Sequence, residues 1–318
     1  MLKRIYTKKI ITCLVALFAI LLIYLIPSNE EVVNYKEEVE YVNKEVKTNT
    51  IFLLDSNNYL ASTKIIIENT DTEDIAKELI NALIIDSSMQ DKIPSGFKSI
   101  IPSGTTILNL TYDNNVIKVD FSEDLMNTNI ENEERIIEAI VYTLTSIDNV
   151  DFVIIYMNGQ ILTKLPQSKI TLPSTLDRSI GINKEYNITS TKDITKTTIY
   201  YISKFNDDMY YVPVTKVNND TRSKIEIIID ELSSTNVYKS NLMSYLNSNT
   251  EIISVNENED ELVINFNSAI LGDINTKDIL EEVIYTISMS VNDNYDVENV
   301  ILSVENEEIH KSVLKSIE

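Results

Sequence analysis

Few residues in this chain have the chemistry of a nucleophile, a general base or a metal ligand. Its 318 residues include a single histidine, His310, and a single cysteine, Cys13. Ser-His-Asp and Cys-His catalysis, and zinc binding, need His or Cys side chains that converge in one folded domain. Because Cys13 lies in a hydrophobic N-terminal stretch, we expect no such constellation. We expect His310 to be a surface residue of the last strand.

Clustered carboxylates are the remaining candidates for acid–base chemistry. They form two groups, Asp120, Glu123 and Asp124, and Glu131, Glu133 and Glu134. General acid–base catalysis requires a carboxyl group whose pKa is shifted by burial. Asp120 alternates with apolar positions and should face solvent or a partner. The others are typical of solvated faces and of the first turn of a helix, so we predict no catalytic residue.

Metal, nucleotide and glycan sites are also weakly supported. Residues Asn256 to Glu261 lack the spacing and the glycine of an EF-hand calcium loop. The five glycines form neither a G-x-G-x-x-G motif nor a phosphate-binding loop. The pairs Tyr200-Tyr201 and Tyr210-Tyr211 could stack on glycan or form an interface, but such residues more often cover the edge of a core. We therefore predict no metal and no cofactor.

Charge restricts the class of partner. The formal net charge is −22, and such a field repels the phosphates that Lys and Arg side chains hold in nucleic-acid complexes. We therefore expect no nucleic-acid partner. The composition is otherwise that of an ordered, folded chain.

The N-terminus resembles a membrane anchor. Residues 1–9 form a basic tail, residues 10–27 an apolar run that ends at Pro27, and residues 28–49 an acidic stalk or linker. This run is about long enough for a transmembrane helix, and the basic flank places the N-terminus in the cytoplasm. A cleaved signal peptide and a lipoprotein are alternatives. The exit from the run has no Ala-x-Ala-like site, and Cys13 lies near its start.

An internal duplication organises the rest of the chain. Residues 105–125 align without a gap over residues 250–270, and their apolar positions correspond one to one. In each segment, alternating apolar residues on both sides of a polar turn predict a β-hairpin. A second match places residues 137–143 over residues 280–286, where apolar residues at helical spacing predict an amphipathic helix after each hairpin.

Further elements repeat around these matches. Each copy should open with two strands, at 51–54 and 62–67 in the first copy and at 199–202 and 210–215 in the second. A further short strand is expected after each amphipathic helix, at 153–157 and at 300–304. A helix follows, at about 72–85 and 222–232. Thr70 and Glu73 have the spacing of a capping box for the first of these helices. The two copies then cover residues 50–165 and 197–318, joined by an ordered linker at 166–196.

Three pieces of the first copy resemble the GerMN domain of sporulation and spore-germination proteins. They are Ile101-Pro102-Ser103-Gly104-Thr105 before the hairpin, Val119-Asp120-Phe121-Ser122 in it, and Ile140 to Leu144 leading to Val150 through Gly159. The second copy departs from this pattern, with Leu246-Asn247-Ser248-Asn249-Thr250 and Asn265-Phe266-Asn267 at the first two places. Its membership therefore rests on the duplication.

The resemblance implies a fold and a role. The expected class is α+β: two tandem domains similar to ring-building motifs, each with a small, mostly antiparallel sheet and two helices, after one N-terminal transmembrane helix. The implied role is extracytoplasmic, in endospore formation or germination, where copies pack head to tail and can close into rings.

These observations lead to one main hypothesis and two rivals. The chain is expected to be a non-catalytic scaffold with a cytoplasmic N-terminus and an extracytoplasmic body, in the intermembrane space of a sporulating cell. Its expected partners are envelope or sporulation proteins, further copies of itself and the membrane. A peptidoglycan-binding module is the alternative, and it would need an exposed aromatic groove. A carboxylate-based cell-wall hydrolase would need two buried carboxylates in a cleft.

Overall fold

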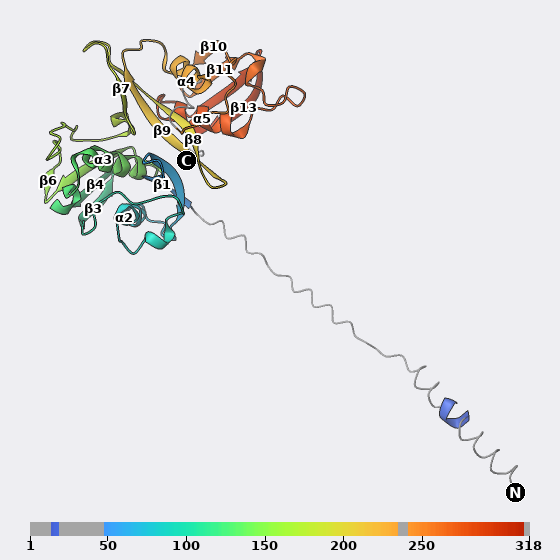
Figure 1. Ribbon diagram of the computed structural model, residues 1–318, viewed down its shortest axis with the longest axis horizontal. Coiled ribbons are helices and arrows are strands. Elements are labelled where there is room, and N and C mark those ends of the chain that lie inside the picture. Colours follow the sequence, from blue (N-terminus) through green and yellow to red (C-terminus); the bar gives the residue numbers. More distant parts are fainter. Residues whose placement is uncertain (1–13, 19–47, 235–240, 315–318) are drawn as a thin grey trace, which may run out of the picture. The chain divides into compact units, whose positions relative to one another are not determined.

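The computed structural model describes residues 14–18, 48–234 and 241–314 (Figure 1). Both copies belong to one compact unit, Val46–Glu318. Residues 14–18 are helical. Among the described residues, no helix has the length and apolar character needed to cross a membrane. The predicted tail, most of the predicted anchor and stalk, and Cys13 lie outside the described residues.

The first copy alternates hairpins and helices (Figure 1). Its elements, in chain order, are β1 (Thr48–Leu54), β2 (Leu60–Ile66), α2 (Thr72–Leu83), β3 (Ile107–Asp113), β4 (Val116–Phe121), α3 (Ile130–Leu144), β5 (Phe152–Met157) and β6 (Gln160–Ile161), with single 3₁₀ turns at Gln90–Lys92 and Glu123–Met126.

A four-stranded sheet with the order β3-β4-β5-β6 forms the base of the first copy. The β3–β4 and β5–β6 pairs are antiparallel. Strands β4 and β5 are parallel, with Val116–Phe121 opposite Phe152–Met157, because helix α3 carries the chain back to the start of the sheet. The polar turn predicted between β3 and β4 places Asn114 and Asn115 at positive φ, as a tight hairpin turn requires.

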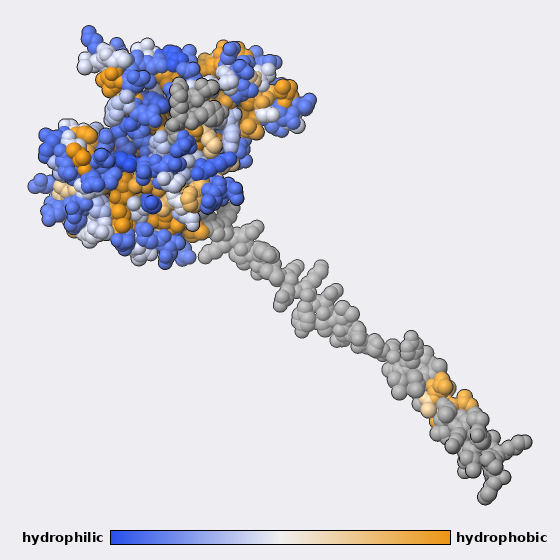
Figure 2. Space-filling view, viewed as in Figure 1, coloured by the Kyte–Doolittle hydropathy of each residue, from blue (hydrophilic) through white to orange (hydrophobic). Residues whose placement is uncertain are grey.

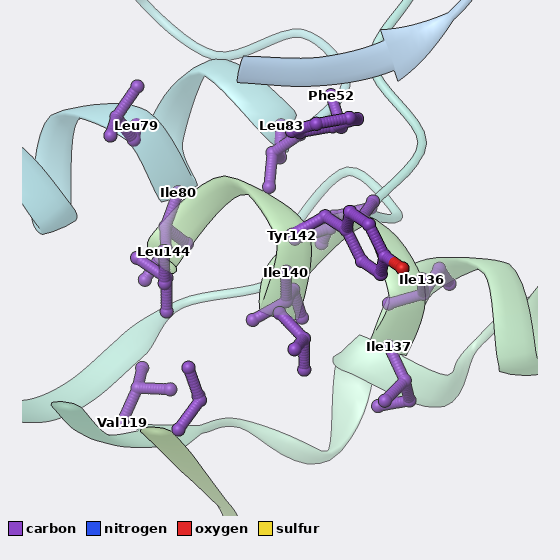
Figure 3. Close-up of a cluster of buried hydrophobic side chains, with 14 of the residues drawn as sticks. Phe52, Leu79, Ile80, Leu83, Val119, Ile136, Ile137, Ile140, Tyr142 and Leu144 are labelled. Carbon is purple, nitrogen blue, oxygen red and sulfur yellow. The ribbon is translucent and has the colours of Figure 1, made fainter. Parts of the chain in front are cut away.

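Helix α3 is buried on nearly all sides. Every residue from Ile136 to Leu144 is buried, Glu138 and Thr143 included. Figure 3 shows α3 side chains that point toward Phe52 and Leu83 on one side and toward Val119 on the other. The helix is therefore enclosed between the β1–β2 hairpin with α2 and the four-stranded sheet, whereas an amphipathic helix would keep one solvent-exposed face.

The N-terminal cap of α2 differs from the predicted capping box of Thr70 and Glu73. Asp71, and not Thr70, caps the N-terminus of α2, since its carboxylate accepts hydrogen bonds from the backbone N–H groups of Glu73 and Asp74. The predicted capping box is therefore wrong. The Glu73 carboxylate instead accepts a hydrogen bond from the backbone N–H of Tyr112 on β3, at 3.0 Å. A true capping box, made by Ser223 and Glu226, begins the helix at Lys224 in the second copy.

The second copy repeats the order of the first. Its elements are β8 (Thr195–Phe205), β9 (Asp208–Asn218), α4 (Lys224–Ser233), β10 (Ile252–Glu257), β11 (Glu261–Phe266), α5 (Glu281–Asn292), β12 (Asn299–Val304) and β13 (Glu307–Val313), with a 3₁₀ turn at Ser268–Ile270. Its sheet has the order β10-β11-β12-β13, again with one parallel pair, β11–β12. His310 lies on β13 as predicted, but it is half-buried and its Nε2 is 2.9 Å from Ser312 Oγ.

The hairpin match between the copies is confirmed residue by residue. Ile107 pairs with Phe121 and Ile252 with Phe266, and each hairpin has a β-bulge at the next position of its first strand. The sequence departures in the second copy keep the same hydrogen bonds. Asp120 Oδ1 accepts the N–H of Gly159 at 3.0 Å, and Asn265 Oδ1 accepts that of Asn306 at 2.9 Å.

The helix match is displaced by one turn. The backbone N–H of Phe52 donates to Thr143 Oγ1 at 3.0 Å, and the N–H of Tyr200 donates to Ser290 Oγ at 2.9 Å. Thr143 therefore corresponds to Ser290, whereas the sequence match places it over Thr286. A slip of four residues is about one helical turn and keeps the apolar face aligned, so periodicity alone did not distinguish the two registers.

The linker is ordered and belongs to the packed structure. Leu172, Leu176 and Ile182 are buried with the first copy, and a 3₁₀ turn forms at Arg178–Ile180. Strand β7 (Glu185–Asn187) pairs in parallel with the end of β9. Strand β2 also reaches β9, so the opening hairpins of both copies and the linker form one five-stranded sheet. The sequence did not predict this shared sheet.

Candidate functional site at the junction of the two copies

The shared sheet brings side chains of both copies into contact. Ser62 pairs with Tyr211, and the Ser62 hydroxyl donates to the Tyr211 carbonyl at 3.2 Å. The Tyr210 hydroxyl donates to Asp55 at 3.0 Å, and its ring packs edge-on against Phe97 at 4.9 Å between centroids. Gly96 has no room for a side chain, because a Cβ atom there would lie 2.5 Å from the Phe205 ring. The junction is therefore closely packed.

Arg178 of the linker connects the C-terminal ends of helices α3 and α5. Its guanidinium forms a 2.8 Å ion pair with Asp293, which follows α5 and is 1% exposed. It also donates to Ser146 Oγ at 2.8 Å and to Thr145 Oγ1 at 3.1 Å, just after α3. The guanidinium carbon lies 5.3 Å from the centroid of the Tyr142 ring, within cation–π range. The positive charge of the guanidinium is stabilised here by the negative C-terminal ends of both helix dipoles.

A second ionic cluster joins the linker to the middle of α3. Lys184 Nζ lies 2.6 Å from Glu134 and 3.1 Å from Glu138. Burial raises the pKa of the Glu138 carboxyl, against the opposing effect of Lys184. Next to it, the Asn183 amide bonds the Leu60 and Pro213 carbonyls at 2.7 and 2.8 Å, one in each copy. These contacts fix the linker between the copies.

A cleft of about 320 Å³ opens beside Arg178, between the linker and the second copy. Most of its lining residues carry polar side chains: Arg178, Ser179, Gly181, Thr195, Lys196, Thr197, Thr198, Thr215, Arg222, Lys224, Ile227, Asp293 and Asn294. Partial burial lowers the pKa of Lys224, and burial together with nearby Lys184 lowers that of Lys196. Positive charge is thus concentrated in one cleft of an acidic chain.

Carboxylates of the two predicted clusters make separate structural hydrogen bonds and do not converge on one site. Asp120 holds the turn at Gly159, and Asp124 accepts a hydrogen bond from Ser122 at 3.1 Å. Glu133 is fully buried, and its oxygens accept the N–H groups of Gln167 and Ser168, both at 2.7 Å. The prediction of a solvated face is therefore wrong for Glu133, because a linker turn supplies two backbone donors that sequence spacing does not show.

The other predicted features are placed as follows. Tyr200, Tyr201 and Tyr210 are buried, as expected for residues that cover a core edge. Tyr211 lies 5.8 Å from the Tyr285 ring, between centroids. A very open hollow at the β10–β11 turn is lined by Glu257, Glu259, Asp260, Glu261 and Glu298, together with Asn258 and Asn299. Within the described ranges, no group of three or more His, Cys, Asp or Glu side chains could hold a metal ion.

Sequence reasoning missed Arg178, Asp293, Lys196 and Lys224. One signal was present: Arg178 is one of only four arginines in the chain and lies in the predicted linker. Arginine is preferred over lysine at partly buried ion pairs because its planar fork binds several acceptors. The partners are 33 and 115 residues away in the chain, so spacing could not identify them.

The fold and the junction define a class of protein: an α+β protein of two tandem domains with an ordered linker packed between them. The Germane family model, described as "Sporulation and spore germination", matches residues 50–163 and 198–310. The chain belongs to this family.

Two relatives support the assignment. The spore germination protein GerM of Bacillus subtilis (strain 168) is 29% identical over 262 residues, which cover 80% of this chain and 70% of the relative. The solved structure of the tandem GerMN domains of B. subtilis GerM superposes with a TM-score of 0.74 at 26% identity, over 82% of this chain and 92% of that one. The protein therefore has a role in sporulation or germination, and its family is not a known enzyme family.

Proposed function

We propose that this protein is a non-catalytic scaffold of the cell envelope in endospore formation or germination. In this proposal the apolar run at residues 10–27 anchors it in the membrane with its N-terminus in the cytoplasm, and the two copies lie outside, in the intermembrane space of a sporulating cell. The copies assemble with other envelope proteins or with further copies of the chain, and a ring is one closed form of such an assembly.

The observation that carries the proposal is an exposed apolar side chain repeated in both copies. Leu108 and Ile253 are the extra residues of the two β-bulges, in the edge strands β3 and β10. They occupy equivalent positions and are 53% and 54% exposed. A bulge redirects a side chain away from the regular pleat, and such bulges are usual at sheet edges and functional sites.

A single exposed leucine has no particular meaning in a soluble protein. An exposed apolar residue at the same bulge of two diverged copies carries more information than a single exposed leucine. Nothing in the hairpin geometry requires an apolar residue at this position. On the face shown in Figure 2, hydrophobic side chains form separate small patches on a mostly hydrophilic surface. Small apolar contacts surrounded by polar residues are typical of protein–protein interfaces. Each contact is weak alone, and two contacts made by one unit bind more tightly than either does.

The junction supports the same role. The shared sheet, Arg178 and the Asn183 amide hold the two copies in one unit. A scaffold that presents two equivalent bulges from one unit can bind two sites of a partner with little loss of linker entropy.

The test uses the full chain in a mild detergent, with molar mass measured by light scattering over a concentration series, alone and with candidate sporulation envelope proteins. The variant Leu108→Asp/Ile253→Asp should abolish any association. Ile130→Asp is a matched control, because Ile130 is also 53% exposed and an acidic residue is tolerated in the first turn of a helix. A chain that stays monomeric with every partner but sediments with purified cell wall would instead favour the peptidoglycan-binding function.

A further inference from the structure

The cleft beside Arg178 has a charge opposite to that of the chain. Four of its thirteen lining residues are basic, Arg178, Lys196, Arg222 and Lys224, and one, Asp293, is acidic. The whole chain has a formal net charge of −22. A polar, concave site with one sign of charge raises the local concentration of ions of the opposite sign.

The two arginines of the cleft are already neutralised. Arg178 is paired with Asp293. Arg222 forms ion pairs with Asp220 at 2.7 Å and with Asp230 at 3.1 Å. Carboxylates already compensate the positive charge of both arginines. The arginines can orient a bound anion, but they leave no uncompensated charge that would attract one.

The two lysines are different. Lys196 Nζ donates to the carbonyl oxygens of Ser179 and Ile180, at 3.1 and 3.4 Å. Lys224 Nζ donates to the carbonyl of Asn294 at 3.2 Å. Among the residues that the structure describes, neither ammonium group forms an ion pair with a carboxylate; Glu134 and Asp177 only partly offset the lowering of the Lys196 pKa by burial and by Lys184. An ammonium group has three donors, so each lysine keeps at least one N–H for a further acceptor.

The lining also defines the chemistry of a ligand. Only Gly181 and Ile227 lack a polar side chain, and four threonines contribute hydroxyl groups. An apolar ligand would leave these groups without partners, and a cation would be repelled. The volume of about 320 Å³ is near the lower end of the roughly 300–1,000 Å³ range of small-molecule sites. An oxyanion with several acceptor oxygens and a small body fits these conditions.

We propose that this cleft binds a phosphate group, carried by a small phosphate ester or by a phosphodiester chain, through Lys196 and Lys224. The site goes beyond the scaffold role and does not depend on it. Ser179 and Gly181 belong to the linker and Lys224 to the second copy, so a bound phosphate bridges the two parts of the junction. Binding therefore stabilises the joined arrangement of the copies.

The test is calorimetric titration of the full chain in a mild detergent at pH 7 and fixed ionic strength. The probes are inorganic phosphate, glycerol 3-phosphate and a short poly(glycerol phosphate) chain. We expect saturable binding of one phosphate group per chain and a rise in Tm with ligand concentration. Binding of the monoester alone identifies a small phosphate ester as the ligand, and binding of the polymer as well identifies the phosphodiester chain.

The variant Lys196→Gln/Lys224→Gln should bind inorganic phosphate about 100-fold more weakly, about tenfold for each charge-assisted hydrogen bond that is lost. The control Lys118→Gln/Lys164→Gln removes the same charge from two exposed lysines outside the cleft and should bind as the parent does. Lys196→Arg keeps the charge and should stay within about threefold of the parent. An equal loss in the control, or no saturable binding by the parent chain, overturns the proposal.

Discussion

The two copies share a hairpin but cover it differently. In the first copy, helix α2 packs along β3, the Glu73 carboxylate accepts the Tyr112 N–H, and Leu110 is only 5% exposed. In the second copy, the equivalent Val255 is 39% exposed, and every described residue of β10 after Ile252 is exposed. Local alternation and a polar turn thus determine the hairpin, whereas the preceding helix determines how much of it remains open.

The central helices differ in the same way. At the positions of Glu133 and Glu138 in α3, the one-turn correction places Leu280 and Tyr285 of the second copy. The first copy uses its two buried glutamates to hold the linker, through the N–H groups of Gln167 and Asn183. Leu280 and Tyr285 carry no carboxylate that could accept such bonds, so equivalent helix positions serve different contacts in the two copies.

The largest expected effect comes from removing the aromatic side chain that ends the second strand of either hairpin. Phe121 and Phe266 are both fully buried, so Phe121→Ala and Phe266→Ala should each lower the free energy of unfolding by about 3–5 kcal/mol. Because the copies share a sheet, both variants should show one urea transition by circular dichroism and by tyrosine fluorescence. Two separate transitions in either variant would mean that the copies unfold independently.

Arg178→Met should destabilise the junction by about 2–3 kcal/mol. The substitution leaves Asp293 buried without its charge partner, and the loss is smaller than for a fully enclosed pair because Arg178 is 14% exposed. Urea denaturation measures the loss. Adding Asp293→Asn should recover part of it, and a double variant that is no more stable than Arg178→Met would show that the ion pair is not the cause.

The corrected helix register can be checked with hydroxyl deletions. Thr143→Val and Ser290→Ala each leave a buried backbone N–H without its acceptor and should cost about 1–2 kcal/mol. Thr286 Oγ1 only bonds the carbonyls of Glu282 and Val283 within its own helix, so Thr286→Val should cost less than about 0.5 kcal/mol. A loss at Thr286 equal to that at Thr143, with none at Ser290, would restore the original alignment.

The smallest effect is a pH dependence confined to the first copy. Burial raises the folded-state pKa of Glu138 above its ordinary value of 4.5, so the folded protein binds this proton more tightly than the unfolded chain. The resulting stabilisation is complete below pH 4.5 and is lost as the pH rises through the folded pKa. Glu138→Gln should remove this decline, measured by urea denaturation between pH 4 and 7. Tyr285→Phe, at the equivalent position, should leave it unchanged.

Sequence patterns were most informative where the interactions are local. The hairpin register was predictable because a slip of one residue would expose Ile117, Val119 and Phe121 together. The helix register was not, because apolar residues recur with each turn. The role of Glu133 and the whole junction escaped prediction for another reason: Arg178 and Asp293 are 115 residues apart, and no periodicity connects them.

The pairing of β2 with β9 has a consequence for how the chain must be made. Ser62 and Tyr211 are 149 residues apart, so the outer edge of β2 has no partner until most of the polypeptide has been synthesised. At ribosomal speeds of about 5–20 residues per second, this interval is roughly 7–30 s. During that time an exposed strand edge can pair with a neighbouring nascent chain. Biogenesis of the protein should therefore depend on a holdase that shields this hairpin until its distant partner arrives.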